Sequence, residues 1–415
     1  MEPIFSLMTN FLSFRTAAVL PFIPLILYHF INIKIERAQL ATRTSWDTHY
    51  DYIVIGSGSG GAVMASRLSE DPSIKVLLLE AGGPEKAFSQ ISIYAFFLQK
   101  TNMDWNFVTE PQQHSCFGLK NRQSAWPRGK SIGGSTAINV MLYVRGNSRD
   151  YDHWAKQGAT GWSWSQVFPY FIKAENNMDS NSVASGYHGI GGPLSVTRFD
   201  YPTKAARAFQ AAGPYLGYPS GNFNGQTQST FTIPQRTIYN GEQFSVAKAY
   251  LEPIYQKRSN LHILANSFVT RILFDDNKRA IGVEFDRNSH RNNVVYVNRE
   301  VILSAGAIMS PKILLLSGIG PREQLNQFGI PVIADLPVGE NLQEHYASGV
   351  LFTLEKESSL DMTRDFSLEQ LYSYVTKKDS LFASNILEGI AFIKTKFVNE
   401  TDDFPDIEMH MVPGE

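Results

Sequence analysis

A short apolar segment, residues 50–55 (YDYIVI), marks the first clear change in the hydrophobic pattern. Its β-branched and aromatic residues predict a buried parallel strand. The glycine-rich run 56–61 follows directly, then the small residues 62–68, which tolerate a helix, and then a second apolar run, 75–79. Glu80 stands at the carboxyl end of this second strand. Strand, turn, helix and strand in this order predict a βαβ unit.

Further apolar runs of the same kind occur in the second half of the chain. They predict strands at 260–264, 268–274, 280–285, 294–297 and 300–304. The last of these leads into Ala305-Gly306-Ala307, and a helix is predicted from Pro311 to about Ser317. The pattern therefore predicts an α/β protein with a Rossmann-like nucleotide-binding domain.

Residues 149–255 have a different character, since they are rich in aromatic residues, glycine and turn-forming residues. The tail, 347–415, continues this character. We interpret both segments as one α+β domain inserted into the nucleotide-binding domain. The nucleotide-binding domain then consists of residues 50–148 and 256–346.

The first 49 residues precede these domains and contain an uncharged apolar stretch, 16–33. Its length is at the lower limit for a spanning helix, and Pro21 and Pro24 weaken such a helix. We expect either a signal peptide or an uncleaved N-terminal membrane anchor, rather than a buried helix of the fold. Both send the chain into the secretory pathway, to an extracellular or membrane-anchored location. The sequon 399–401 is compatible with that route.

Composition and charge narrow the classes of function. The chain has 415 residues, enough for two large domains, and 43% hydrophobic against 18% charged residues, a globular balance. Its 37 basic and 39 acidic residues give a net charge of -2, which argues against nucleic-acid binding. The single cysteine, Cys116, excludes an intrachain disulfide. The histidines show no metal-ligand spacing, so we predict no metal site.

The glycine-rich run has the spacing Gly56-x-Gly58-x-x-Gly61. Gly56 permits the tight turn, Gly58 lets a pyrophosphate approach the backbone, and Gly61 allows close packing of helix and strand. The helix N-terminus presents free N–H groups to the phosphates. Glu80 is placed to accept hydrogen bonds from the ribose hydroxyls. Because a strand precedes this motif and a helix follows it, we predict a dinucleotide site, which the motif alone does not assign to FAD or NAD.

Longer segments resemble the signature segments of the glucose-methanol-choline (GMC) family of FAD oxidoreductases. They are 127–146 (PRGKSIGGSTAINVMLYVRG), 306–321 (GAIMSPKILLLSGIGP), 338–345 (VGENLQEH), and 51–56 together with 79–83. The similarity runs from about Tyr50 to Glu415. Segments 150–154 and 161–164 look most like the arthropod branch that contains glucose dehydrogenases.

This resemblance implies FAD as cofactor and names further site residues. Arg128 would serve the anionic cofactor, as Lys130 could. Gly133 and Gly134 would let the backbone lie close to a flat ring or a phosphate. Two more positions match the family. Asn139 would form a hydrogen bond with a flavin edge, and Val269 matches a position whose backbone meets the adenine.

Each of these residues also has a plainer interpretation. Segment 127–146 can be a basic loop followed by a buried helix, and Val269 an ordinary strand valine. At the position of Ile138, some relatives carry a histidine that is covalently attached to the flavin. The resemblance therefore implies non-covalent FAD. His345 lies in a family segment close to the cofactor, and we interpret it as structural.

The resemblance implies oxidation of a CH–OH group, with a histidine base and hydride transfer to flavin N5. In relatives that histidine lies in a C-terminal segment after the substrate-binding domain, and we find no match to it before Glu415. The catalytic residues are therefore unknown. The sequence fits either an incomplete record of a working enzyme, which we favour, or a short product. For the 415 residues as given we expect weak FAD binding and little or no turnover.

Three functions remain open at this point. The first is an FAD-dependent dehydrogenase or oxidase of an alcohol or sugar, with a quinone or oxygen as acceptor. The second is a lyase of the hydroxynitrile type, which uses the same fold without redox turnover. The third is a non-catalytic FAD-binding fragment. The sequence does not identify the substrate, the acceptor or the oligomeric state.

Overall fold

The computed structural model describes residues 43–199, 201–354, 358–361, 365, 367–378, 380–398 and 402–414. The apolar stretch 16–33 and the sequon 399–401 lie outside these residues. Within the described part of the chain, no helix combines the length and apolar character needed to cross a membrane.

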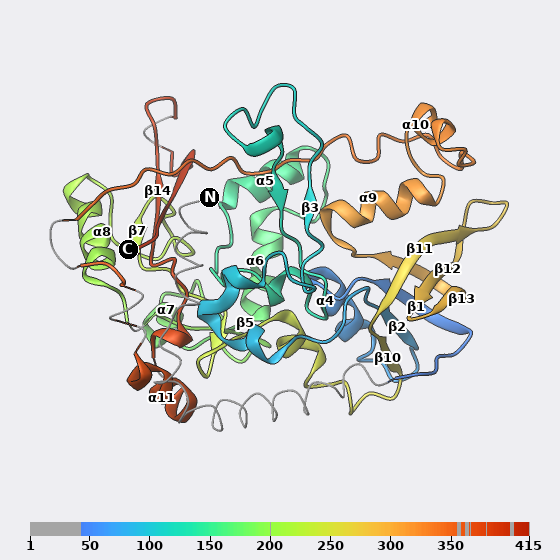
Figure 1. Cartoon of the computed structure of the whole chain (residues 1–415), viewed down its shortest axis with the longest axis horizontal. Helices are drawn as coiled ribbons and strands as arrows, with labels where there is room; N and C mark the ends of the chain where they lie inside the picture. Colours follow the sequence, from blue (N-terminus) through green and yellow to red (C-terminus); the bar gives the residue numbers. More distant parts are fainter. Residues whose placement is uncertain are drawn as a thin grey trace.

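A six-stranded sheet forms the nucleotide-binding half (Figure 1). Its strands are, in sheet order, β10 (Leu261–Leu264), β2 (Val76–Leu79), β1 (His49–Ile55), β13 (His290–Leu303), β12 (Ala280–Arg287) and β11 (Ser267–Phe274). The first four run parallel, and β12 and β11 continue the sheet in antiparallel order. The predicted α/β class is confirmed.

Both faces of this sheet are covered, as an apolar strand without polar alternation requires. In β1, Val54 faces a core shared with helix α4 (Ser59–Leu68) and the π-helical turn η7 (Ala247–Leu251). Ile53 and Ile55 face the opposite core, which includes Ile313 of helix α9 (Gly306–Leu316). η7 thus packs on the sheet half, although its residues precede the predicted domain boundary at 255. The domain division as a whole stays a prediction.

Two predicted elements differ from the structure. Helix α9 begins at Gly306, whereas the sequence predicted its start at Pro311. Pro311 lies inside the helix, beyond its first turn, a position where proline is usually disfavoured because it lacks an N–H. The positive φ of +85° at Gly306 turns the chain out of the strand and into the helix earlier. Strand β13 is continuous and joins the two strands predicted at 294–297 and 300–304.

A second sheet, of strands β15 (Ile407–Met411), β14 (Gly389–Ile393) and β7 (Phe231–Thr232), lies toward the other end of the molecule (Figure 1). Short strand pairs are β3 (Phe107–Val108) with β4 (Ala125–Trp126), β5 (Glu175–Asn177) with β6 (Leu194–Val196), and β8 (Ile238–Tyr239) with β9 (Glu242–Gln243). The other α-helices of the described residues are α5 (Ser148–Lys156), α6 (Trp164–Ala174), α7 (Ser180–Ala184), α8 (Lys204–Tyr215), α10 (Arg322–Gln327) and α11 (Leu368–Lys377). Short helical turns are η3 (Ala87–Gln90), η4 (Ser92–Leu98), η5 (Lys120–Arg122), η6 (Gly134–Ala137) and η8 (Leu381–Ala383).

A buried ionic network ties several segments of this second part together. The Glu175 carboxylate accepts a hydrogen bond from the Arg145 guanidinium, from His188 Nδ1 at 2.8 Å and from the Asn177 amide at 2.7 Å. The side chains of Glu175 and His188 are fully buried. Burial alone would raise the pKa of Glu175, but these bonds and the charge of Arg145 together lower it below its ordinary value.

We therefore predict that Glu175→Gln destabilises the fold in a pH-dependent way. At pH 7 the loss should be about 3 kcal/mol, because Arg145 keeps a buried charge without its charged partner. A lowered folded-state pKa contributes stability above the unfolded pKa of about 4.3, and this contribution is lost as pH falls through the folded pKa. The difference from wild type should therefore narrow below about pH 4.3.

Urea unfolding between pH 7 and pH 3.5 measures this difference. Glu70→Gln is the control. Glu70 is an exposed residue paired with Arg67, so its substitution should change the free energy of unfolding little at any pH. A difference for Glu175→Gln that widens as pH falls would contradict the assignment.

Candidate functional site

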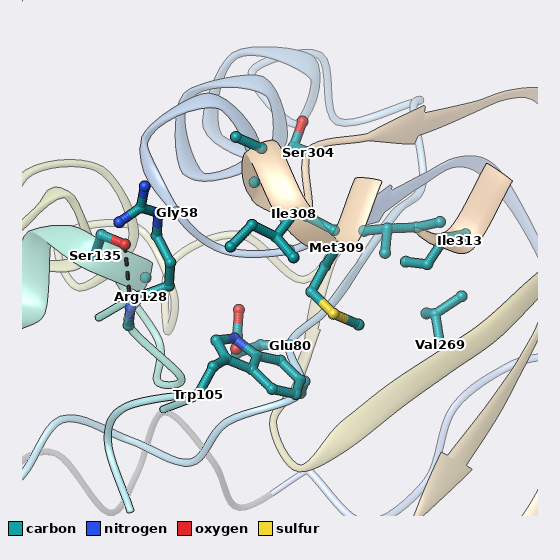
Figure 2. Close-up of a pocket in the computed structure, with 18 of the residues that line it drawn as sticks. Gly58, Glu80, Trp105, Arg128, Ser135, Val269, Ser304, Ile308, Met309 and Ile313 are labelled. Atoms are coloured by element: carbon teal, nitrogen blue, oxygen red, sulfur yellow. Dashed lines mark hydrogen bonds between the residues drawn. The ribbon is translucent and has the colours of Figure 1, made fainter. Parts of the chain in front are cut away.

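A cavity of about 320 Å³ opens at the carboxyl ends of the parallel strands (Figure 2). The residues that end β1 and β2 line it, as do Ser304 and Ala305 after β13. In open α/β sheets this edge is where ligands bind, because the strands end there and the helices begin.

The walls of this cavity depend on close contact between main chains. A Cβ on Gly61 would lie 1.8 Å from the Gly56 carbonyl oxygen, and one on Gly134 would lie 2.7 Å from Gly58 Cα. Gly56 has a φ of +92°, and a Cβ there would lie 2.5 Å from the Ser304 carbonyl oxygen. These positions require glycine for the packing of the loops themselves. Gly58 differs, since a Cβ there would meet Gly134 Cα only at 3.9 Å. Its missing side chain leaves space on the cavity side.

Two helices begin at this cavity. Helix α4 follows Gly58 and helix α9 follows Ala305, and neither of these cap residues has a polar side chain that could accept from the helix N–H groups. The first residues of both helices line the cavity. Free N–H groups and the positive ends of two helix dipoles therefore face it, an arrangement that favours an anion.

Arg128 adds a positive charge beside Gly58, where α4 begins (Figure 2). Its guanidinium donates to Glu344 at 2.8 Å and to the Pro127 carbonyl at 2.8 Å. Both members of the ion pair are partly exposed, so the pair holds the side chain loosely. Arg128 can turn toward an anionic ligand at small cost.

Glu80 lies in the middle of the cavity with its carboxylate buried. One carboxylate oxygen accepts from Ser57 N at 2.9 Å and Ser57 Oγ at 2.7 Å. Within the described residues, the other oxygen accepts only from Gly82 N, at 2.8 Å. Burial raises the pKa of Glu80, while these hydrogen bonds and the charge of Lys130 act against the shift. A carboxylate oxygen has room for more than one donor, so the second oxygen can accept from a ligand hydroxyl.

The far end of the cavity is apolar. Val269 and Phe268 of β11 line it together with the side chain of Met309 from α9. Figure 2 shows Val269, Met309 and Ile313 at this end, with Glu80 and Trp105 between them and the Arg128 end. The cavity therefore changes from N–H groups, through a carboxylate, to an apolar surface.

The structure brings together most of the predicted site residues. Gly56, Gly58, Glu80, Arg128, Gly134 and Val269 line the cavity. Gly61 and Gly133 do not line the cavity themselves. Gly61 lies against Gly56, which does. Gly133 has a φ of +93° and is buried where a Cβ would lie 2.7 Å from Glu85 Oε1.

Asn139 lies outside this cavity. Its side chain is exposed, and its Oδ1 accepts from Met141 N at 3.0 Å. No histidine is among the cavity-lining residues in the described part of the chain. There, too, no group of three His, Cys, Asp or Glu side chains could hold a metal ion.

Sequence reasoning did not single out Trp105, Phe107 or Ser304–Met309 as cavity residues. For Ser304–Met309 a signal was present, since a predicted strand ends there in Ala305-Gly306, as β1 ends in Gly56. For Trp105 and Phe107 the local pattern carries no such signal.

The chain is similar to known proteins over most of its described length. The GMC oxidoreductase family model matches residues 50–347. Glucose dehydrogenase (FAD, quinone) of Drosophila melanogaster is 39% identical over 378 residues, which cover 90% of this chain and 59% of that protein. Alcohol dehydrogenase (acceptor) of Pseudomonas putida is 36% identical and covers 88% and 65%. The chain thus spans about three-fifths of the length of the curated relatives it matches.

Solved structures of similar proteins share the fold. Pyridoxine 4-oxidase from Mesorbium loti has 33% identity and a TM-score of 0.64, with 69% of this chain and 55% of that chain covered. An FAD-dependent oxidoreductase from Chaetomium thermophilum has 29% identity and a TM-score of 0.70, with 83% and 62% covered.

We predict that Gly58→Ala lowers stability only slightly, since alanine is a poorer helix N-cap than glycine, and weakens dinucleotide binding. The methyl group meets the protein at ordinary contact distance but occupies the side of the cavity where the backbone must approach a phosphate. Affinity for ADP, measured by calorimetry, should fall at least roughly tenfold, which corresponds to about 1.4 kcal/mol.

Gly221→Ala is the matched control, because Gly221 lies outside the cavity and a Cβ there would also meet the protein at ordinary contact distance, 3.6 Å from Thr230 Cγ2. It should bind ADP as wild type does and melt at about the same temperature. Equal ADP affinity of Gly58→Ala and wild type would show that the phosphates do not lie at Gly58.

Proposed function

The chain belongs to the GMC oxidoreductase family, and on this premise we propose that it binds FAD non-covalently and serves the oxidation of a CH–OH group in a small alcohol or sugar. The observation that carries the proposal is the order of surfaces along the cavity. Helix N-termini, a buried carboxylate and an apolar end follow one another as pyrophosphate, ribose and adenine do in the ADP half of FAD.

The residues present fit this cofactor. The first residues of α4, with Gly58, would hold the pyrophosphate, and Arg128 would add charge. Glu80 would accept from the ribose, and Val269 would contact the adenine. When bound, the flavin would supply the redox chemistry by accepting hydride from the alcohol carbon.

Asn139 and Ile138 match family positions beside the flavin half of FAD. The Asn139 side chain is exposed, and the Met141 N–H fixes its oxygen, so its amide NH₂ group is what it would offer to a flavin edge. Ile138 is a buried aliphatic residue and cannot form a bond to the flavin. The described cavity supports the proposed binding of the cofactor, and it supplies no residue for the substrate proton.

The first test is the binding and reduction of flavin. The purified chain should change the absorbance spectrum of FAD added in excess, and ADP should reverse this change by competition. Protein from its natural source should lose its flavin absorbance bands when an alcohol substrate is added without oxygen. Binding of NAD but not FAD would contradict the cofactor, and cyanide release from a cyanohydrin without bleaching would indicate a lyase instead.

We also propose that the chain enters the secretory pathway, on the basis of the uncharged apolar stretch 16–33. A reporter protein fused after residue 49 should reach the medium or the outer membrane face of an animal cell. Replacing two apolar residues of the stretch by lysine should keep the reporter in the cytosol. A reporter that stays cytosolic with the unchanged stretch would refute the proposal.

A further inference from the structure

Trp105 enters the cavity from the start of the β3–β4 hairpin, and the functions assigned so far do not use it (Figure 2). We propose that Trp105 is the residue that binds the flat base of the cofactor's ADP half, by stacking its indole on the purine. This inference rests on the proposed function and names a binding residue within it.

The indole belongs to a group of three aromatic rings that all line the cavity. The rings of Trp105 and Phe107 are stacked at 5.7 Å with an interplanar angle of 7°, and Phe268 lies 6.0 Å from Trp105. Phe268 precedes Val269 in β11, so this wall is continuous with the apolar end. An aromatic wall beside a ribose-binding carboxylate suits a planar base, because every base presents a π-face.

The backbone of Trp105 is fixed without a ligand. The buried Asp104 carboxylate accepts from the N–H of Lys100 at 2.8 Å, of Asn106 at 3.0 Å and of Arg128 at 2.9 Å. Trp105 N donates to the Arg128 carbonyl at 2.9 Å. Asn106 then turns the chain with a φ of +55°. Three bonds to one carboxylate hold the loop in place, so little conformational entropy is lost when a ring binds.

Lys130 covers a face of the indole in this structure. Its Nζ lies 4.6 Å from the centre of the Trp105 ring, within the range of a cation–π interaction, so a base that stacks on this face takes the place of the ammonium group. The same charge acts on Glu80, as the pKa of that carboxyl reflects. Asp104 and Trp105 therefore place an aromatic ring next to the ribose acceptor. The expected ligand is a purine nucleotide. Flavin mononucleotide lacks the purine, so its affinity should not depend on Trp105.

Two substitutions at position 105 separate stacking from simple packing. Trp105→Phe keeps an aromatic face, and Trp105→Leu keeps apolar volume without one. Stacking of one base on an aromatic residue is worth about 1–3 kcal/mol, so Trp105→Leu should weaken ADP and FAD binding at least roughly fivefold. Trp105→Phe should stay within about threefold of wild type, since a phenyl ring also stacks.

The controls use the same hairpin and a truncated ligand. Phe117→Ala removes a ring that is 66% exposed, well beyond the strands of the hairpin, and should leave ADP affinity unchanged. Binding of flavin mononucleotide should be equal in all variants. Thermal unfolding without ligand checks that each variant folds.

The outcomes distinguish this inference from the function on which it rests. If folded wild-type protein binds neither ADP nor FAD, the proposed function is wrong. If wild type binds ADP and folded Trp105→Leu binds it equally tightly, the role of Trp105 is wrong and the cofactor assignment stands. If Trp105→Phe is as weak as Trp105→Leu, the site needs the indole for packing and stacking is rejected.

Discussion

The site depends on one constraint, the contact of main chains at the carboxyl edge of the sheet. The turn at Gly56 lies against the Ser304 carbonyl, Gly61 against the Gly56 carbonyl, and Gly134 against Gly58. Three segments far apart in sequence thereby reach one place with their backbones exposed to a common cavity. A side chain at any of these contacts would separate the segments.

This contact also explains the electrostatic character of the site. When backbones form the wall, the groups that face a ligand are the N–H groups at the starts of α4 and α9. Side chains only modify that field. Arg128 is paired with Glu344, and the Glu80 carboxyl group accepts three hydrogen bonds from Ser57 and Gly82. The N–H groups that favour an anion and the Glu80 carboxyl that would accept from a ribose can then lie a short distance apart, without pairing with each other.

The parts that could be predicted from sequence are those whose role is decided by neighbours in the chain. Gly56, Gly58 and Glu80 follow from a strand, a turn and a second strand in order, and the structure places all three on the cavity. Trp105 could not be predicted, because its position comes from the bonds that Asp104 makes to Arg128 and to its own loop. The predicted start of α9 was wrong, since the chain turns into the helix at Gly306 and the helix continues through Pro311. Asn139 fits the family pattern, yet its contact with a flavin involves a surface outside this cavity and stays a prediction.

The central claim is that the cavity receives the ADP half of a flavin dinucleotide in one orientation. A crystal structure of the chain with bound ADP tests it most directly. The account predicts the pyrophosphate at Gly58 and the first turn of α4, the ribose hydroxyls on Glu80, and the adenine between Trp105 and Val269. Adenine found at the Gly58 end, or ADP bound elsewhere on the protein, would contradict it.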